Sequence, residues 1–251
     1  MRSCARALPW LMGPALALTG LLPLYACEGT LRVALDIGHD LSRSGAASAT
    51  GKSEYAFNAR LAQEALSALN TLPDLDVFLI EDRGRRISLG ERRARARAGQ
   101  ADVLISLHHD SAQERFLSSR VEDGKVLYST DLFEGFSVFY SEKNARSERA
   151  LEMASALGSA LRYYRFVPTD HHAMDVDGER RDLVVPEYGV YRFDDLAVLK
   201  ADMPAVLLEA GVIVNPQEEW RLEQPIYRQQ MVAALALSLQ RMRCPLLADD
   251  V

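Results

Sequence analysis

Short apolar segments alternate with amphipathic helical segments along most of the chain, and this alternation constrains the fold more than any other feature. Strands are predicted at 31–40, 76–82, 102–111, 135–142 and the start of 203–220. Helices are predicted at 54–70, 88–101, 147–164 and 227–242. Because such alternation buries a sheet between helices, we expect one α/β domain with a mixed, mostly parallel sheet and helices on both faces.

The composition is that of a folded domain without surplus positive charge. With 251 residues, of which 48% are hydrophobic, the chain is long enough to build a full core. Its formal charge of −6 argues against nucleic acid as the main partner, because phosphate binding depends on an excess of lysine and arginine.

The first 27 residues have the build of a secretory signal. Arg2 and Arg6 precede an apolar run that extends to about Ala26. An apolar run of about 20 residues is also long enough for an uncleaved membrane anchor, but the prolines within it disfavour a long helix. We therefore expect an exported protein, with a signal peptide at 1–27 and a catalytic domain at 28–251.

Two alternatives are open for Cys27. The sequence LYAC, which ends at Cys27, resembles a bacterial lipobox, in which the cysteine receives a lipid anchor. In the other case the signal is cleaved nearby, and Cys27 and Cys244 pair in an oxidising compartment. The two cysteines flank the fold, and chain termini are often close in space. The sequence does not decide between lipid and disulfide, and association with a membrane is expected only for the lipidated form.

Three polar side chains stand where a predicted strand ends or a helix begins. His39 follows the first strand, Glu54 starts the next helix and His108 lies near the end of the third strand. Neighbouring parallel strands end at the same edge of a sheet, so these side chains can meet there. Two imidazoles and one carboxylate form a common catalytic zinc set with a fourth position for water. Each residue alone also has a structural interpretation, as a hydrogen-bonded histidine or a carboxylate at a helix start.

Glu209 is an unusual residue for its surroundings. It lies at the end of the apolar strand that opens MPAVLLEAGVIVNPQEEW, residues 203–220, where another apolar side chain would be expected. Buried carboxylates are rare unless they are paired, bound to metal or catalytic. A zinc hydrolase needs one carboxylate beyond its metal ligands to move protons. The structural alternative is a glutamate paired with an arginine.

Four sequence blocks follow one another in an order that is specific to one family. They are VALDIGHD, GKSEYAFNARLA, EDRGRRISLGERRARARAGQADVLISLHHDS and LAVLKADMPAVLLEAGVIVNPQEEW. Together they resemble the zinc-dependent N-acetylmuramoyl-L-alanine amidases of the amidase-3 type, and the match extends from about 31 to 242. The resemblance implies that His39, Glu54 and His108 hold Zn²⁺, and that Glu209 is the catalytic carboxylate.

The third block departs from the family pattern after its last histidine. His109 and Asp110 replace the common Asn or Ala that follows the third ligand. The register of the motif favours His108 over His109 as that ligand.

Residues 165–200 are predicted to form a long, polar, partly irregular loop. The segment contains DHHAMDVDGERRDLVVPEYGVYRFDD, including His171 and His172, and loops of this length usually serve a site. It resembles a His-rich, Gly-Glu-x-Arg loop found in an elaborated branch of the same family. Either it lines the cleft, with Arg180 and Arg181 binding substrate carboxylates, or it is a solvated loop.

The resemblance implies hydrolysis of the amide between N-acetylmuramic acid and L-alanine in peptidoglycan or its muropeptide fragments. We expect this reaction in the periplasm or cell envelope, and the sequence leaves open whether an activator protein takes part. A zinc carboxypeptidase, or another amidohydrolase acting on wall peptides, would differ in the amide that it cuts. The remaining alternative is a catalytically silent wall-binding regulator, and Glu209 argues against it because a binder does not need that carboxylate.

Overall fold

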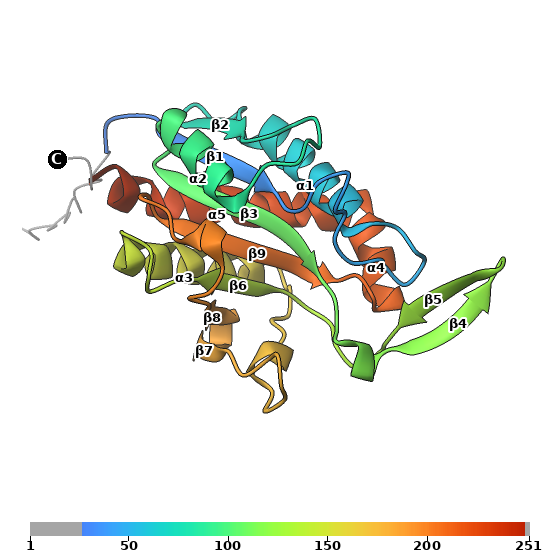
Figure 1. The fold of residues 1–251 in the computed structure, drawn as a ribbon. Coiled ribbons are helices and arrows are strands. Elements are labelled where there is room, and N and C mark those ends of the chain that lie inside the picture. The colour runs from blue at the N-terminus through green and yellow to red at the C-terminus, as the bar shows by residue number, and fades with distance from the viewer. Residues whose placement is uncertain (1–26, 249–251) are drawn as a thin grey trace, which may run out of the picture.

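A seven-stranded sheet runs through the centre of the protein (Figure 1). The computed structural model describes residues 27–248. Across the sheet the strands are β2 (Leu75–Leu79), β1 (Leu31–Ile37), β3 (Val103–Asp110), β9 (Ala205–Val212), β6 (Ser137–Tyr140), β8 (Val190–Arg192) and β7 (Asp182–Val185). The pairings of β2, β1, β3 and β9 are parallel, whereas β6 is antiparallel to β9. The prediction of a mixed, mostly parallel sheet is confirmed.

Helices cover both faces of this sheet, as the sequence predicted. The helices are α1 (Glu54–Leu69), α2 (Leu89–Ala98), α3 (Ser147–Tyr163), α4 (Pro216–Glu223) and α5 (Pro225–Leu247). Apolar side chains of α1, α3 and α5 form one core with the strands, and α2 packs on the opposite face. In α1, buried Leu61, Ala65 and Leu69 recur at the spacing that places side chains on one helical face.

Side chains alternate between the two faces of the sheet along β3 and β9. This alternation places polar side chains on the face that α2 covers, at one end of the sheet. In β3, Val103, Ile105 and Leu107 enter the larger core under α1 and α5. Successive strand side chains point to opposite faces, so His108 shares its face with buried Leu104. His108 is paired in register with Glu209 on β9, and this pairing places both side chains on the same face.

Residues 165–200 are more ordered than the sequence indicated. The expected loop contributes β7 and β8, which extend the sheet beyond β6. It also forms three short 3₁₀ helices, which are η2 (His171–Ala173), η3 (Pro186–Tyr188) and η4 (Ala197–Leu199). The two strands have only four and three residues, too few for a clear alternation of polar and apolar side chains.

A β-hairpin occupies most of the polar stretch that follows β3. Its strands are β4 (Ser118–Glu122) and β5 (Lys125–Ser129), and it extends away from the body of the domain (Figure 1). Asp123 and Gly124 form its turn, both with positive φ, which is the Asp-Gly pattern of a tight hairpin. All of β4 is exposed, so no buried face marks it as a strand in the sequence.

A disulfide joins the two ends of the described chain. Cys27 is bonded to Cys244 in α5, with Cα atoms 5.3 Å apart. A sulfur atom in this bond cannot also carry a lipid, so the structure favours the disulfide of the two alternatives that the sequence left open. The signal peptide expected at 1–27 lies outside the described residues except for Cys27 itself. Within 27–248, no helix has the length and apolar character needed to cross a membrane.

We predict that reduction of this disulfide lowers the free energy of unfolding by about 3–5 kcal/mol, because the bond closes most of the chain into one loop. Urea unfolding with and without reductant measures the change. Cys244→Ser should unfold like the reduced wild type and should not respond to reductant. A wild-type protein whose unfolding midpoint is indifferent to reductant would contradict the predicted bond.

Candidate metal and catalytic site

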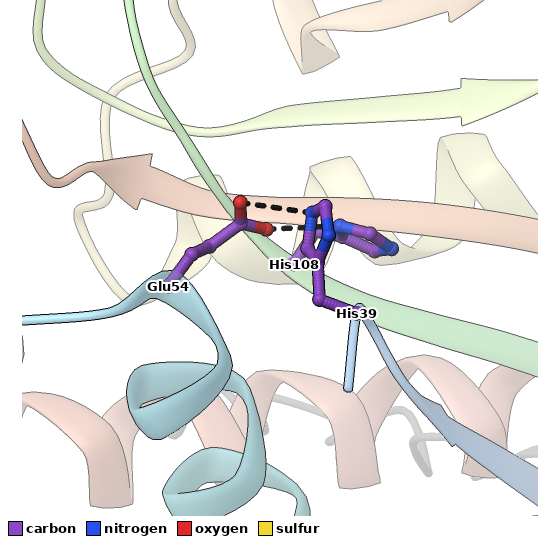
Figure 2. Close-up of side chains that lie close together, drawn as sticks. All are labelled: His39, Glu54 and His108. Carbon is purple, nitrogen blue, oxygen red and sulfur yellow. Dashed lines mark hydrogen bonds and ion pairs between the residues drawn. The ribbon is translucent and has the colours of Figure 1, made fainter. Parts of the chain in front are cut away.

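The structure brings His39, Glu54 and His108 together at one end of the sheet (Figure 2). His39 follows β1, Glu54 is the first residue of α1 and His108 lies in β3. Glu54 Oε2 lies 2.9 Å from His39 Nε2, and Glu54 Oε1 lies 3.0 Å from His108 Nδ1. The side chain of His39 is 33% exposed, whereas that of Glu54 is 6% exposed. The group is therefore buried on the Glu54 side and open to solvent on the His39 side.

Glu54 is held as an ionised carboxylate by several donors. Its Oε1 accepts a hydrogen bond from Asn58 Nδ2 at 3.2 Å, and its Oε2 accepts one from the backbone N–H of Ala46 at 3.1 Å. Burial by itself would raise the pKa of Glu54, but hydrogen bonds from His108 and His39 outweigh it and hold the pKa well below its usual range. In turn, the hydrogen bond to Glu54 raises the pKa of His39.

Two glycines make the close approach of these side chains possible. A Cβ atom on Gly38 would lie 2.4 Å from His108 Nε2, and one on Gly45 would lie 2.3 Å from Glu54 Oε2. Gly45 also has φ +77°, a conformation that residues with a Cβ atom rarely adopt. Larger residues at either position would displace the side chains of the site.

A buried ion pair fixes the backbone at His39. Arg92 of α2 binds Asp36 Oδ1 through Nη1 at 2.7 Å, and Ser106 Oγ donates to Asp36 Oδ2 at 2.7 Å. Nη2 of Arg92 donates to the backbone carbonyl of His39 at 2.7 Å. His39 has φ +65°, which is an uncommon conformation for a residue other than glycine. Arg92 thus supports the strained backbone from which the His39 side chain projects.

Sequence reasoning did not assign a role to Asp36 or Arg92. Arg92 belongs to the Leu-x-x-Arg helix quoted from the third block, but its Asp36 partner is distant in the sequence and lies inside a strand of mostly apolar residues. The signal that could have found the pair is Asp36 itself, because an unpaired aspartate is rarely buried in a strand.

The histidine next to His108 points the other way. His109 is buried on the α1 side, where its Nδ1 lies 2.7 Å from Asn58 Oδ1 and its ring packs on Phe57. Complete burial lowers the pKa of His109 to about 3, so its imidazole is neutral. His108, rather than His109, therefore shares the group with His39 and Glu54.

Glu209 lies beside this group without a counter-ion of its own. Its residue pairs in register with His108 on β3 and with Ser137 on β6. The Oε2 atom is shielded from solvent and has no hydrogen-bond partner among the described residues. Burial, reinforced by the charges of Asp110 and Glu54, raises the pKa of Glu209 well above its usual value. No arginine among residues 27–248 forms an ion pair with Glu209, and the charge of Arg181 lowers the pKa of Glu209 less than burial raises it.

The two arginines predicted to bind substrate are occupied by other contacts. Arg180 is exposed and forms ion pairs with Asp175 and Asp177. Arg181 pairs with Glu179 and lies over the ring of Phe193 at 4.5 Å. A role for Arg180 and Arg181 in binding substrate carboxylates stays a prediction.

The chemistry of the first group fits zinc. His39, Glu54 and His108 each offer one donor atom, and these three atoms lie within 4.8 Å of one another. Two imidazole nitrogens and one carboxylate oxygen are ligands that zinc takes in hydrolase sites that keep a fourth position open.

A comparison with models of known protein families agrees with the order of the four sequence blocks and with the geometry of the His39, Glu54 and His108 group. The sequence model of the amidase-3 family, described as N-acetylmuramoyl-L-alanine amidase, matches residues 33–241. The chain belongs to the amidase-3 family. The match includes all four residues singled out from the sequence, His39, Glu54, His108 and Glu209.

Two curated relatives are similar to most of this chain. It is 29% identical over 225 residues to the N-acetylmuramoyl-L-alanine amidase AmiC of Neisseria meningitidis, covering 83% of this chain and 52% of AmiC. It is 26% identical over 219 residues to the probable amidase AmiB of Haemophilus influenzae, covering 80% of this chain and 49% of AmiB. The chain thus spans about half the length of these relatives.

Solved amidases share the fold. An N-acetylmuramoyl-L-alanine amidase from Clostridium difficile 630 superposes with a TM-score of 0.65 at 21% identity, covering 86% of this chain and 97% of that one. The CwlD amidase from Clostridioides difficile, solved in complex with the GerS lipoprotein, gives a TM-score of 0.58 at 16% identity, with coverages of 84% and 98%.

We predict that His108→Ala weakens metal binding by at least about tenfold, because it removes a donor atom from the first group. His109→Asn should retain the metal, because its amide can still donate to Asn58 from the opposite face of the strand. Competition with a chelating zinc indicator measures both affinities, and circular dichroism checks that both variants fold. Loss of affinity in His109→Asn alone would transfer the ligand role to His109.

Proposed function

We propose that this chain is a zinc-dependent N-acetylmuramoyl-L-alanine amidase, which hydrolyses the amide between N-acetylmuramic acid and L-alanine in peptidoglycan. The observation that carries the proposal is the unpaired carboxylate of Glu209 beside a group of two histidines and a glutamate. Family membership supports the identity of the bond that is cut.

His39, Glu54 and His108 would hold the metal ion. When bound there, zinc would supply a Lewis acid that polarises the scissile carbonyl and lowers the pKa of a water molecule. The neighbours of these ligands restrict their movement, because Arg92 holds the His39 carbonyl and Asn58 holds Glu54. The chain thus provides a preorganised site before substrate arrives.

Glu209 would carry the proton between the two halves of the reaction. Its free Oε2 accepts a proton from the attacking water and returns it to the departing L-alanine amine. A pKa above the usual value makes the ionised form of Glu209 a stronger base than an exposed carboxylate. The rigid β9 strand keeps the carboxylate next to His108.

The setting of this activity would be outside the cytoplasm. The signal-like residues that precede Cys27 and the Cys27–Cys244 disulfide support export to the periplasm or cell envelope. Peptidoglycan or its muropeptide fragments would be the substrate, and neither nucleic acid nor a membrane is required as a partner. An activator protein would be a further partner.

We predict that Glu209→Gln lowers the rate of peptidoglycan hydrolysis by about 10²–10⁴-fold, because the amide cannot accept the proton. Metal content should remain that of the wild type, since Glu209 is not among the grouped donors. Release of soluble muropeptides from labelled peptidoglycan measures the rate, and metal analysis of the same samples provides the control. Wild-type turnover in Glu209→Gln would refute the proton-transfer role.

A further inference from the structure

A second group of metal-binding side chains lies two residues beyond His108. Asp110 at the end of β3 meets His171 and His172, which begin η2 in the 165–200 segment. Both histidines are buried, with exposed fractions of 3% and 7%. One donor atom from each of the three residues lies within 4.8 Å of the others.

The two imidazoles converge on one carboxylate oxygen. Asp110 Oδ2 lies 2.8 Å from His172 Nε2 and 3.2 Å from His171 Nε2. The two rings have centroids 4.0 Å apart and are tilted by 39°. His171 Nε2 is shielded from solvent and makes no hydrogen bond of acceptable geometry. A buried, unpartnered nitrogen is therefore aimed at the place where the three donor atoms meet.

Hydrogen bonds at the far side of each ring orient the two Nε2 atoms. His172 Nδ1 lies 3.0 Å from Glu179 Oε2, and His171 Nδ1 lies 2.8 Å from Thr169 Oγ1. When each Nδ1 donates to its oxygen, each Nε2 keeps a lone pair that faces the Asp110 carboxylate. Acceptors that face one another across 3 Å repel unless a proton or a metal ion lies between them. This arrangement is the usual one for metal-binding histidines, whose other nitrogen donates to a fixed partner.

The partners of these rings are themselves held in place. Glu179 accepts a further hydrogen bond from Gln113 Nε2 at 2.8 Å and an ion pair from Arg181. The hydroxyl of Tyr191 donates to the backbone carbonyl of Thr169 at 2.8 Å. The group is thus built from both the 165–200 segment and the end of β3, with supporting contacts on each side.

The second group matches the first in chemistry and spacing. Each contains two imidazole nitrogens and one carboxylate oxygen. The ion-pair separations of 2.8 and 3.2 Å around Asp110 compare with 2.9 and 3.0 Å around Glu54. Donor atoms about 3.3 Å apart are expected around a tetrahedral zinc ion with metal–donor distances of about 2.0–2.1 Å.

A proton is the competing cation. A proton on His172 Nε2 satisfies only the 2.8 Å contact to Asp110, and a second proton is needed on His171 Nε2 for the 3.2 Å contact. A metal ion coordinates all three donors at once, and it is therefore the better match to the geometry.

We propose that Asp110, His171 and His172 bind a second divalent transition-metal ion, of the zinc class. The ion would tie the 165–200 segment to the end of β3, next to the first group. The inference does not rest on the amidase activity, because it concerns a separate set of donors whose occupancy is measured directly.

Metal stoichiometry of the full chain tests this inference. The protein is loaded with zinc, freed of excess metal by gel filtration and analysed for bound metal by mass spectrometry. In a second measurement the metal-free protein is titrated with Co²⁺, and the visible absorption of bound Co²⁺ gives the number of equivalents taken up. The wild type is expected to hold two ions, one for each group. His39→Ala and His171→Ala should each hold one, and the double variant none. Arg180→Gln, an exposed change in the same segment, is the matched control and should hold two.

The outcomes separate this site from the proposed catalytic site. A wild type with one ion that is lost in His39→Ala and kept in His171→Ala overturns the second site and leaves the amidase proposal intact. One ion that is kept in His39→Ala and lost in His171→Ala supports the second site and removes the metal from the catalytic proposal. If His171→Ala does not fold, Asp110→Asn replaces it. If neither variant folds, the Co²⁺ titration of the wild type decides. Binding of one equivalent of Co²⁺ per chain overturns the second site, and binding of two equivalents supports it.

Discussion

The register of β3 against β9 is the constraint on which the rest of the site depends. It places His108 beside Glu209 on one face of the sheet, while Leu107 and Leu208 enter the core on the other face. A slip of one residue would exchange these faces and bury the polar side chains among leucines. The apolar pattern that stabilises the fold therefore also fixes the position of the chemistry.

Several carboxylates are buried close to this end of the sheet. The side chains that contact each carboxylate, and offset its negative charge, indicate its role. Asp36 pairs with Arg92, and Glu54 contacts His39 and His108. Asp110 meets His171 and His172. Buried charges are costly unless paired, so these contacts offset the cost of burying the carboxylates. Of the four carboxylates Asp36, Glu54, Asp110 and Glu209, only Glu209 forms no ion pair with a described residue, and this is the property expected of a group that exchanges protons rather than one that stabilises structure.

The fold class and the first group could be predicted because they depend on local patterns. Periodicity placed His39 and His108 at the ends of parallel strands and Glu54 at a helix start, and such positions meet at one edge. Glu209 stood out because it interrupts an apolar strand. The family resemblance then gave each of these residues a role, and the structure brings His39, Glu54 and His108 together as that role requires.

Other features depend on contacts between distant residues, which periodicity does not report. The Asp36–Arg92 pair joins β1 to α2. The group of Asp110, His171 and His172 joins β3 to a segment about sixty residues later. The strands β7 and β8 were missed because they are short. Composition left lipid and disulfide equally open for Cys27, and only the distance to Cys244 in the fold favours the disulfide.

The central claim is that this site cuts one particular amide with the help of a metal ion. Mass spectrometry of products from purified peptidoglycan, incubated with the mature zinc-loaded protein with and without a chelator, tests it most directly. The account predicts stem peptides with a free L-alanine amino terminus, formed only without chelator. Cuts elsewhere in the stem, or the same products in the presence of chelator, would contradict it.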